Sequence, residues 1–186
     1  MVEASNGSGP IGTYTYDGDG DGKRVKKLVP STGELTVFVY DAAGKQVAEY
    51  STIVANSTDA KVNYLTSDHL GSPRINTDAK GAIISRHDYH PFGEEIDGPG
   101  GRTTGLNYGD DSVRKQFTGY ERDSETDLDY AKARMFGYSL GRFTSPDPLA
   151  KSAKPGLPQS WNRYLYVLNN PLVLTDPTGT VWGYYD

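Results

Sequence analysis

The sequence contains no cysteine, and this absence excludes a disulfide-based scaffold, a cysteine zinc site and a cysteine nucleophile. No apolar run approaches the roughly 18 residues that a membrane-spanning helix needs. Residues 1–10 are rich in glycine and serine and lack the charged and apolar regions of a signal peptide. The 24 acidic side chains outnumber the 19 basic ones and leave a net charge of −5, which argues against a protein that binds the nucleic-acid backbone.

Turn-forming and aromatic residues, in contrast, are plentiful. The 186 residues include 22 glycines and 11 prolines, more than average but below the share that is typical of low-complexity chains. Tyrosine supplies 14 aromatic rings, beside 5 phenylalanines and 2 tryptophans. So many half-buried rings argue against disorder. The length suits one domain or one piece of a larger repeat structure.

A short phrase recurs along the first half of the chain. Each copy reads as a strand with an aromatic or polar character, a turn that begins with aspartate and contains glycine, and a second strand. The turn aspartates Asp17, Asp41 and Asp78 lie 24 and 37 residues apart. Aspartate suits the first turn position, and glycine accepts the positive φ that closes the hairpin. Residues 35–40 alternate as a strand does. The pattern predicts an all-β chain of stacked antiparallel hairpins, none of which buries its face alone.

The pattern changes after Val113. Residues 114–120 are strand-like, and residues 128–136 favour a hairpin over a short helix because glycines follow closely behind them. Residues 161–169 are the best candidate for a helix, which Asn170-Pro171 would end. The C-terminal part is therefore predicted to be small and irregular, with one short helix.

Two aspartates stand in matching positions in this C-terminal part. Asp147 and Asp176 are 29 residues apart, and each precedes a proline that favours an extended backbone at the aspartate. Two carboxylates held close together cannot both ionise, and such a pair can activate a nucleophile and protonate a departing amide nitrogen. Spacing alone does not bring the two together, and the sequence by itself favours two loop-capping aspartates. It likewise favours ordinary ion pairs for the nearby Arg134 and Arg142.

Neither a metal nor a cofactor is expected. Residues 17–22 match the start of a calcium-binding loop, but the twelfth position is Leu28, where a bidentate glutamate is needed. A glycine-rich hairpin turn is therefore the favoured interpretation. His69, His87 and His90 show no ligand spacing on a defined element. The chain has no Gly-x-Ser-x-Gly nucleophile elbow.

Six motifs in a fixed order carry a family likeness. They are residues 68–74 (DHLGSPR), 88–94 (DYHPFGE), 117–123 (FTGYERD), 141–148 (GRFTSPDP), 162–171 (NRYLYVLNNP) and 176–179 (DPTG). Together they resemble the Rhs-repeat-associated core domain of the Rhs/YD-repeat family, which includes the C subunits of insecticidal Tc toxins and polymorphic toxins of bacteria. The likeness covers residues 12–180, nearly the whole chain.

The resemblance implies a strip of β-hairpins that spirals into a hollow shell, closed at one end by a plug. The chain is then expected to divide into a disordered segment or tail (1–11), YD-repeat-like hairpins (12–112), the Rhs core or autocleavage plug (113–180) and a residual C-terminal stub (181–186). It also implies bacterial parent proteins that are secreted or on the cell surface. The expected partners are the flanking shell and a C-terminal toxin segment, with neither nucleic acid nor a membrane span.

The resemblance further implies that the chain is a single-turnover aspartyl autoprotease. Matched by position, Asp147 and Asp176 would be its catalytic pair, Arg134 its supporting arginine, and Thr180–Val181 the bond that is cut. Two positions depart from the family pattern. Met135 follows the arginine where the family often has tyrosine or aspartate, and Thr180 stands where a large apolar residue is usual. Met135 removes a polar contact, and Thr180 fits an apolar pocket poorly.

Two other functions fit the same residues. The chain could be a non-catalytic structural module that associates with flanking repeat strands, or with itself, through open sheet edges. Its tyrosines could also form a carbohydrate-binding platform, although rings spaced along strands more often pack. The sequence does not identify the toxin cargo or the host.

Overall fold

The computed structural model describes residues 1–18, 22–44, 46–52, 62–96, 104–108, 111, 113–149 and 152–184. The chain divides into two compact units, residues 1–60 with 124–126 and residues 61–123 with 127–186. The boundary therefore lies near residue 60 and not at residue 112, where the change in sequence pattern placed it. One reason is that the predicted hairpin around Asp78 contacts the C-terminal part through the segment before it, where Ser72 Oγ accepts a hydrogen bond from the Thr118 N–H at 2.9 Å.

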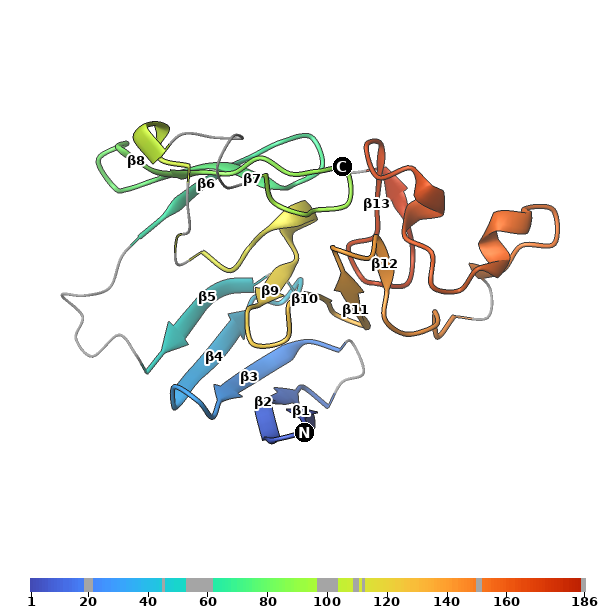
Figure 1. Cartoon of the computed structure of the whole chain (residues 1–186), viewed down its shortest axis with the longest axis horizontal. Coiled ribbons are helices and arrows are strands. Elements are labelled where there is room, and N and C mark those ends of the chain that lie inside the picture. Colours follow the sequence, from blue (N-terminus) through green and yellow to red (C-terminus); the bar gives the residue numbers. More distant parts are fainter. Residues whose placement is uncertain are drawn as a thin grey trace. The chain divides into compact units, whose positions relative to one another are not determined.

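The first unit is one antiparallel sheet of five strands in the order β1-β2-β3-β4-β5 (Figure 1). The strands are β1 (Val2–Asn6), β2 (Gly9–Tyr16), β3 (Arg24–Val29), β4 (Glu34–Tyr40) and β5 (Gln46–Ser51). The prediction that residues 1–11 form a tail is wrong. β1 pairs with β2 through a tight turn in which the Ser8 N–H donates to Asn6 Oδ1 at 2.9 Å. Such pairing uses the main chain, so a glycine- and serine-rich segment can take part in it.

The predicted hairpin turns are present where the structure describes them. The Gly44 N–H donates to the Asp41 carbonyl at 3.0 Å, and the Gly81 N–H donates to the Asp78 carbonyl at 3.0 Å. Both glycines have positive φ, 77° and 82°. The all-β, antiparallel class is thus confirmed. Residues 19–21, at the centre of the first turn and of the calcium-loop motif, lie outside the described residues.

Alternation in β4 separates a buried face from an exposed face. Thr36 and Phe38 are buried, whereas Val37 and Val39 are exposed. The predicted alternation of residues 35–40 is therefore correct. The pattern alone did not say which face would be covered.

The second unit contains three small antiparallel sheets (Figure 1). The first sheet has β6 (Tyr64–Ser67), β7 (Pro73–Thr77) and β8 (Ile83–Arg86). The second has the order β12-β11-β10-β9, with β9 (Glu121–Asp123), β10 (Leu128–Ala131), β11 (Arg134–Gly137) and β12 (Arg142–Phe143). The third pairs β13 (Leu174–Thr175) with β14 (Gly183–Tyr184). The hairpin favoured for residues 128–136 is confirmed, because β10 and β11 pair with Ala131 opposite Arg134.

The prediction of a short helix over residues 161–169 is wrong. The segment contains only the end of one 3₁₀ turn (Pro158–Trp161) and a second 3₁₀ turn (Val167–Asn169). The Phe143 N–H donates to the Tyr164 carbonyl at 3.0 Å, so the middle of the segment pairs with β12 as a strand would. Val167 and Leu168 have φ of 41° and 54°, a left-handed conformation that a right-handed helix cannot contain.

The prediction of a strand-like stretch at residues 114–120 is also wrong. It carries a 3₁₀ turn, Phe117–Gly119, rather than a strand. Thr118 has a φ of 52° and Gly119 a φ of 73°, and this left-handed pair interrupts any extended pairing. A further 3₁₀ turn spans Thr104–Leu106.

An aromatic cluster forms the core of the second unit. Its buried members are Phe117, Tyr120, Ala131, Phe136, Phe143, Tyr166, Val167 and Leu174. The Phe136 and Tyr166 rings lie 4.7 Å apart between centroids, and Phe136 meets Phe143 edge to face at 5.6 Å. Aromatic pairs of this geometry contribute about 0.5–1.5 kcal/mol beyond the burial of their surface. The cluster fixes β11 and the ends of β12 and β13, which carry the residues of the candidate site.

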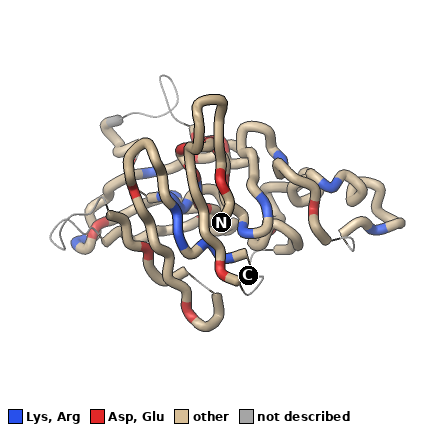
Figure 2. Tube along the Cα trace, turned by 90° about the horizontal axis from the view of Figure 1, so that it is seen from below, with Lys and Arg blue, Asp and Glu red and all other residues tan. Residues whose placement is uncertain are grey.

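Acidic and basic residues are interspersed along the described trace (Figure 2). Several of them are buried as pairs, including Lys27 with Glu125 at 3.0 Å and Arg122 with Asp129 at 2.8 Å. In the part of the chain that the structure describes, no helix has the length and apolar character to cross a membrane.

Candidate active site

Three strand ends of the second unit bring together the residues that the sequence singled out. Arg134 begins β11, Asp147 lies in the loop after β12, and Asp176 directly follows β13. Arg134 and Asp176 are buried, with 4% and 2% of their surface exposed. The Arg134 guanidinium also stacks on the Phe143 ring at 3.5 Å, so the aromatic core fixes its plane.

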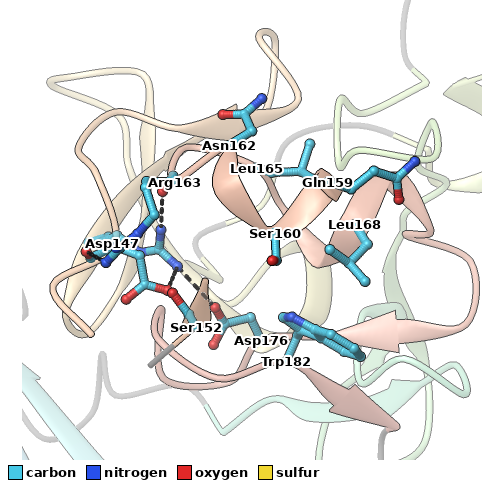
Figure 3. Close-up of a pocket in the computed structure, with 11 residues that line it drawn as sticks. Asp147, Ser152, Gln159, Ser160, Asn162, Arg163, Leu165, Leu168, Asp176 and Trp182 are labelled. Carbon is cyan, nitrogen blue, oxygen red and sulfur yellow. Dashed lines mark hydrogen bonds and ion pairs between the residues drawn. The ribbon is translucent and has the colours of Figure 1, made fainter. Parts of the chain in front are cut away.

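Arg134 connects both carboxylates. Its Nη2 lies 3.5 Å from Asp147 Oδ2 and 3.2 Å from Asp176 Oδ2 (Figure 3). Its Nη1 donates to the Arg163 carbonyl at 3.1 Å, and its Nε donates to the Gly179 carbonyl. One cation therefore faces two anions and the main chain one residue before Thr180. The structure thus brings Asp147, Asp176 and Arg134 together.

Asp176 begins a turn of the same kind as the hairpin turns elsewhere in the chain. Its Oδ1 accepts hydrogen bonds from the Thr180 N–H at 2.9 Å and the Val181 N–H at 3.0 Å. Asp68 and Asp78 likewise accept, at 3.0 and 2.8 Å, from the N–H four residues on. At Asp176 the same contact goes to the Thr180 N–H, and the additional contact with the Val181 N–H, five residues on, places a carboxylate oxygen at the nitrogen of the Thr180–Val181 bond.

Asp147 is held by its own loop. Its Oδ1 accepts from the Leu149 N–H at 2.7 Å, while its backbone N–H donates to the Arg163 carbonyl at 2.9 Å. Arg163 in turn donates through Nη2 to the carbonyls of Asp147 and Leu149. These contacts leave Asp147 Oδ2 directed at Arg134.

Burial changes the proton affinity of the two central groups. Burial raises the pKa of the Asp176 carboxyl, although the Thr180 N–H and Arg134 act in the opposite direction. Burial also lowers the pKa of the Arg134 guanidinium, against the effect of the Asp147 and Asp176 charges. A raised carboxyl pKa is what a proton donor in an acid–base pair requires.

A cavity of about 30 Å³ adjoins the two carboxylates (Figure 3). It is lined by Arg134, Asp147, Ser152, Gln159, Ser160, Asn162, Arg163, Leu165, Leu168, Asp176 and Trp182. A cavity needs roughly 10–15 Å³ of such space to hold one water molecule, so this one is large enough. Its wall is polar at the carboxylates and apolar at Leu165, Leu168 and Trp182. The arrangement can therefore admit a water molecule beside two carboxyl groups.

Curated proteins and solved structures resemble this chain, although no protein-family model matches it. The tRNA nuclease WapA of Bacillus subtilis is 30% identical over 191 residues, which cover 93% of this chain and 8% of WapA. The toxin subunit YenC1 of Yersinia entomophaga is 30% identical over 158 residues, which cover 82% of this chain and 15% of YenC1. These relatives are proteins of the Rhs and Tc-toxin type. Over 82–93% of its own length, this chain is related to these Rhs- and Tc-toxin-type proteins.

The fold of this Rhs-type chain agrees with the relationship. The crystal structure of TcdB2-TccC3-Cdc42 matches it with a TM-score of 0.63 and 25% identity, over 97% of this chain and 9% of that one. In that structure the matched domain is a small part of a larger toxin protein, and the likeness supports a structural domain of the Rhs type in this chain. The chain spans 15% or less of the curated relatives named above.

Three other residues were singled out in the sequence of this Rhs-type chain, namely Arg142, Thr180 and Met135. Arg142 is exposed on β12. Thr180 is half-buried, and its Oγ1 lies 2.9 Å from Thr178 Oγ1, so a hydroxyl partner takes the place of the apolar contact expected there. The Met135 carbonyl accepts from the Thr144 N–H at 2.9 Å.

Sequence reasoning missed two residues of the site in the Rhs-type domain. Tyr120 is buried and donates its hydroxyl hydrogen to the Asp176 carbonyl, and Arg163 supports both Arg134 and Asp147. Both lie inside motifs that carry the family likeness, residues 117–123 and 162–171. Their position in those motifs was the available signal, since neither has a pattern of its own.

His87 belongs to a second cluster, which shares no residue with the site around Asp147 and Asp176. Its Nδ1 lies 2.6 Å from Glu95 Oε1, and its Nε2 lies 3.0 Å from Ser85 Oγ and 3.3 Å from Asp111 Oδ2. Burial alone would lower the pKa of His87, but hydrogen bonds to Asp111 and Glu95 outweigh it and raise the pKa to about 9. Among the described residues, no three His, Cys, Asp or Glu side chains form a group suited to a metal ion.

Proposed function

We propose that this Rhs-type domain cuts its own backbone once, at the Thr180–Val181 bond, as a single-turnover aspartyl autoprotease. The observation that carries the proposal is the position of Arg134 between the Asp147 and Asp176 carboxylates, with Asp176 Oδ1 3.0 Å from the Val181 nitrogen. In a longer parent protein, the cut would separate the domain from the toxin segment that follows it.

The two aspartates take different roles in the proposed reaction. Asp147, which is less buried, is the base that removes a proton from a water molecule in the adjoining cavity. The water oxygen attacks the Thr180 carbonyl carbon and forms a tetrahedral intermediate. The Val181 nitrogen then becomes basic and takes a proton from Asp176, whose raised pKa favours the protonated form. The carbon–nitrogen bond breaks and leaves a carboxyl group on Thr180 and an amine on Val181.

The fold supplies position rather than binding in this reaction. The Asp176 turn holds both Thr180 and Val181 N–H groups on one oxygen. Arg134 Nε donates to the Gly179 carbonyl and so fixes the chain immediately before the bond. Well-oriented intramolecular groups reach effective molarities of about 10⁵–10⁸ M, which is why a bond in the same chain can be cut without a substrate pocket.

Intact-mass analysis of the refolded chain tests the proposal. We expect the wild type to lose the mass of residues 181–186, and Asp147→Asn and Asp176→Asn each to stay at full mass. Asp78→Asn is the matched control, because Asp78 begins a turn with the same contact four residues on, and the residues that follow it, 79–82, are exposed. It should be cut as the wild type is. A folded wild-type chain that keeps its full mass would show the domain to be the non-catalytic structural module instead.

A further inference from the structure

We propose that Trp182, the second residue after the Thr180–Val181 bond, is a specificity-determining residue for the cut. Lys154 and Leu168 form the binding site for its ring, which we call the seat. The proposal rests on the proposed self-cleavage. It adds a requirement on the segment that leaves, whereas the reaction itself uses only the two aspartates, Arg134 and the main chain.

The Trp182 ring occupies a defined position in the second unit. It is partly buried and packs against the aromatic core cluster. Figure 3 shows it beside Leu168, at the apolar end of the cavity wall and next to Asp176. The Lys154 Nζ lies 5.7 Å from the ring centroid, within the range of a cation–π contact. The ring is thus held by an apolar wall and a cation.

The seat is built into the cavity wall. The Lys154 N–H donates to Ser160 Oγ at 2.7 Å, and Ser160 Oγ in turn donates to the Leu157 carbonyl at 2.6 Å. Ser160 is buried and lines the cavity. The main chain that carries Lys154 is therefore fixed from inside the cavity.

Both sides of the cut bond are held, and the downstream side depends on Trp182. Upstream, the Asp176 turn binds the main chain. Downstream, β14 pairs with β13 through the main chain, with Thr175 opposite Gly183. The Val181 and Tyr184 side chains are 60% and 76% exposed, so among the described residues after the bond Trp182 has the side chain that the domain can recognise.

Loss of the ring should slow the cut by loosening the Val181 nitrogen from Asp176. A displacement of about 1 Å at a reacting atom can reduce a rate about hundredfold. We expect Trp182→Ala to slow the cut about tenfold to hundredfold, and Trp182→Phe to recover most of the rate. Lys154→Met should slow it about two- to fivefold, which corresponds to the usual strength of an exposed cation–π contact.

The rate experiment follows the full chain by intact mass at intervals after refolding. Tyr184→Ala is the matched control, because it removes an exposed aromatic ring two residues further on. If Trp182→Ala is cut as fast as the wild type, the seat has no role and the proposal fails while self-cleavage stands. If slow cutting is not restored by Trp182→Phe, the ring is not the recognised feature.

A second measurement tests the seat without any cleavage. The chain has two tryptophans, so Trp161→Phe in an Asp147→Asn background leaves Trp182 as the single tryptophan, whose emission is excited selectively over that of the 14 tyrosines. We expect acrylamide to quench Trp182 markedly less than free tryptophan, and Lys154→Met to increase the quenching. Quenching equal to that of free tryptophan would overturn the seat, even if the wild type proved unable to cut itself.

Discussion

At the scale of single residues, Asp176 shows how a turn residue can acquire a chemical role. Its Oδ1 contact with the N–H four residues on is that of the Asp68 and Asp78 turns, and its contact with the Val181 N–H is additional. Two further features distinguish it, namely its burial and the buried guanidinium of Arg134 at 3.2 Å, whereas the Arg74 guanidinium 3.6 Å from Asp68 is more exposed. Burial raises the pKa of Asp176, and an ordinary turn aspartate exposed to water lacks that effect. The surroundings of the residue, and not its local conformation, set its proposed chemistry.

Gly179 is the residue at which the turn tolerates least change. It has a φ of 70°, and a Cβ at this position would lie 2.4 Å from the Ala131 carbonyl oxygen. We expect Gly179→Ala to lower the free energy of unfolding by about 1–3 kcal/mol and to stop the cut, because the turn must move away from β10. Urea unfolding and intact mass measure the two effects.

Gly183→Ala is the control for that substitution. A Cβ there meets nothing within 4 Å, and the backbone does not have positive φ. It should unfold and cut much as the wild type does. Equal stability of the two variants would show that the close approach at Gly179 is relieved at no cost.

At the scale of elements, the β10–β11 hairpin aligns the site. Ala131 and Arg134 are opposite each other, so only Lys132 and Ala133 form the turn. The Ala133 N–H donates to the Thr178 carbonyl at 3.1 Å, and this ties the hairpin to the Asp176 turn. The hairpin could be predicted from residues 128–136, because the following glycines leave little room for a helix. Its contact with the Asp176 turn could not, because the two segments lie far apart in the sequence.

Lys132 is a weak point of this hairpin. It is exposed and has a φ of 60°, which costs an L-residue with a side chain free energy that glycine avoids. We expect Lys132→Gly to raise the free energy of unfolding by about 0.5–1 kcal/mol, with the cut unchanged. Ala133→Gly, at a position without positive φ, should bring no such gain in the same thermal or urea unfolding experiment.

At the scale of the whole molecule, the second unit contains two buried ionic clusters with different pH responses. The one around His87 should make stability depend on pH. The pKa of His87 is raised to about 9, so the histidine stabilises the fold fully below its unfolded pKa of about 6.5 and loses this effect as the pH rises through 9. The loss amounts to at most about 3 kcal/mol.

Urea unfolding across this pH range measures the effect. His87→Gln should remove most of the decline, because the variant has no proton to lose. The exposed His90→Gln is the control and should decline as the wild type does. A wild type whose stability stays constant between these pH values would show that His87 is neutral in the folded state.

The first unit should associate with copies of itself. β5 is an outer strand that pairs with β4 alone among the described strands, and its Val47 and Tyr50 side chains are 58% and 66% exposed. Such an edge pairs readily with another strand. We expect sedimentation to detect reversible self-association of uncut Asp147→Asn protein, and Val47→Lys to reduce it. Association unaffected by that charge would place the contact on another surface.

The sequence by itself determined the hairpin turns of this protein and its all-β class. An aspartate and a glycine within a few residues specify a hairpin turn through contacts that the turn itself contains, so the all-β hairpins could be predicted. Motif order also identified Asp147, Asp176 and Arg134 as candidates. Only the tertiary structure decided that the three meet, that residues 161–169 pair with β12 rather than form a helix, and that Trp182 lines the cavity. Those outcomes depend on pairing between distant segments, which no local pattern encodes.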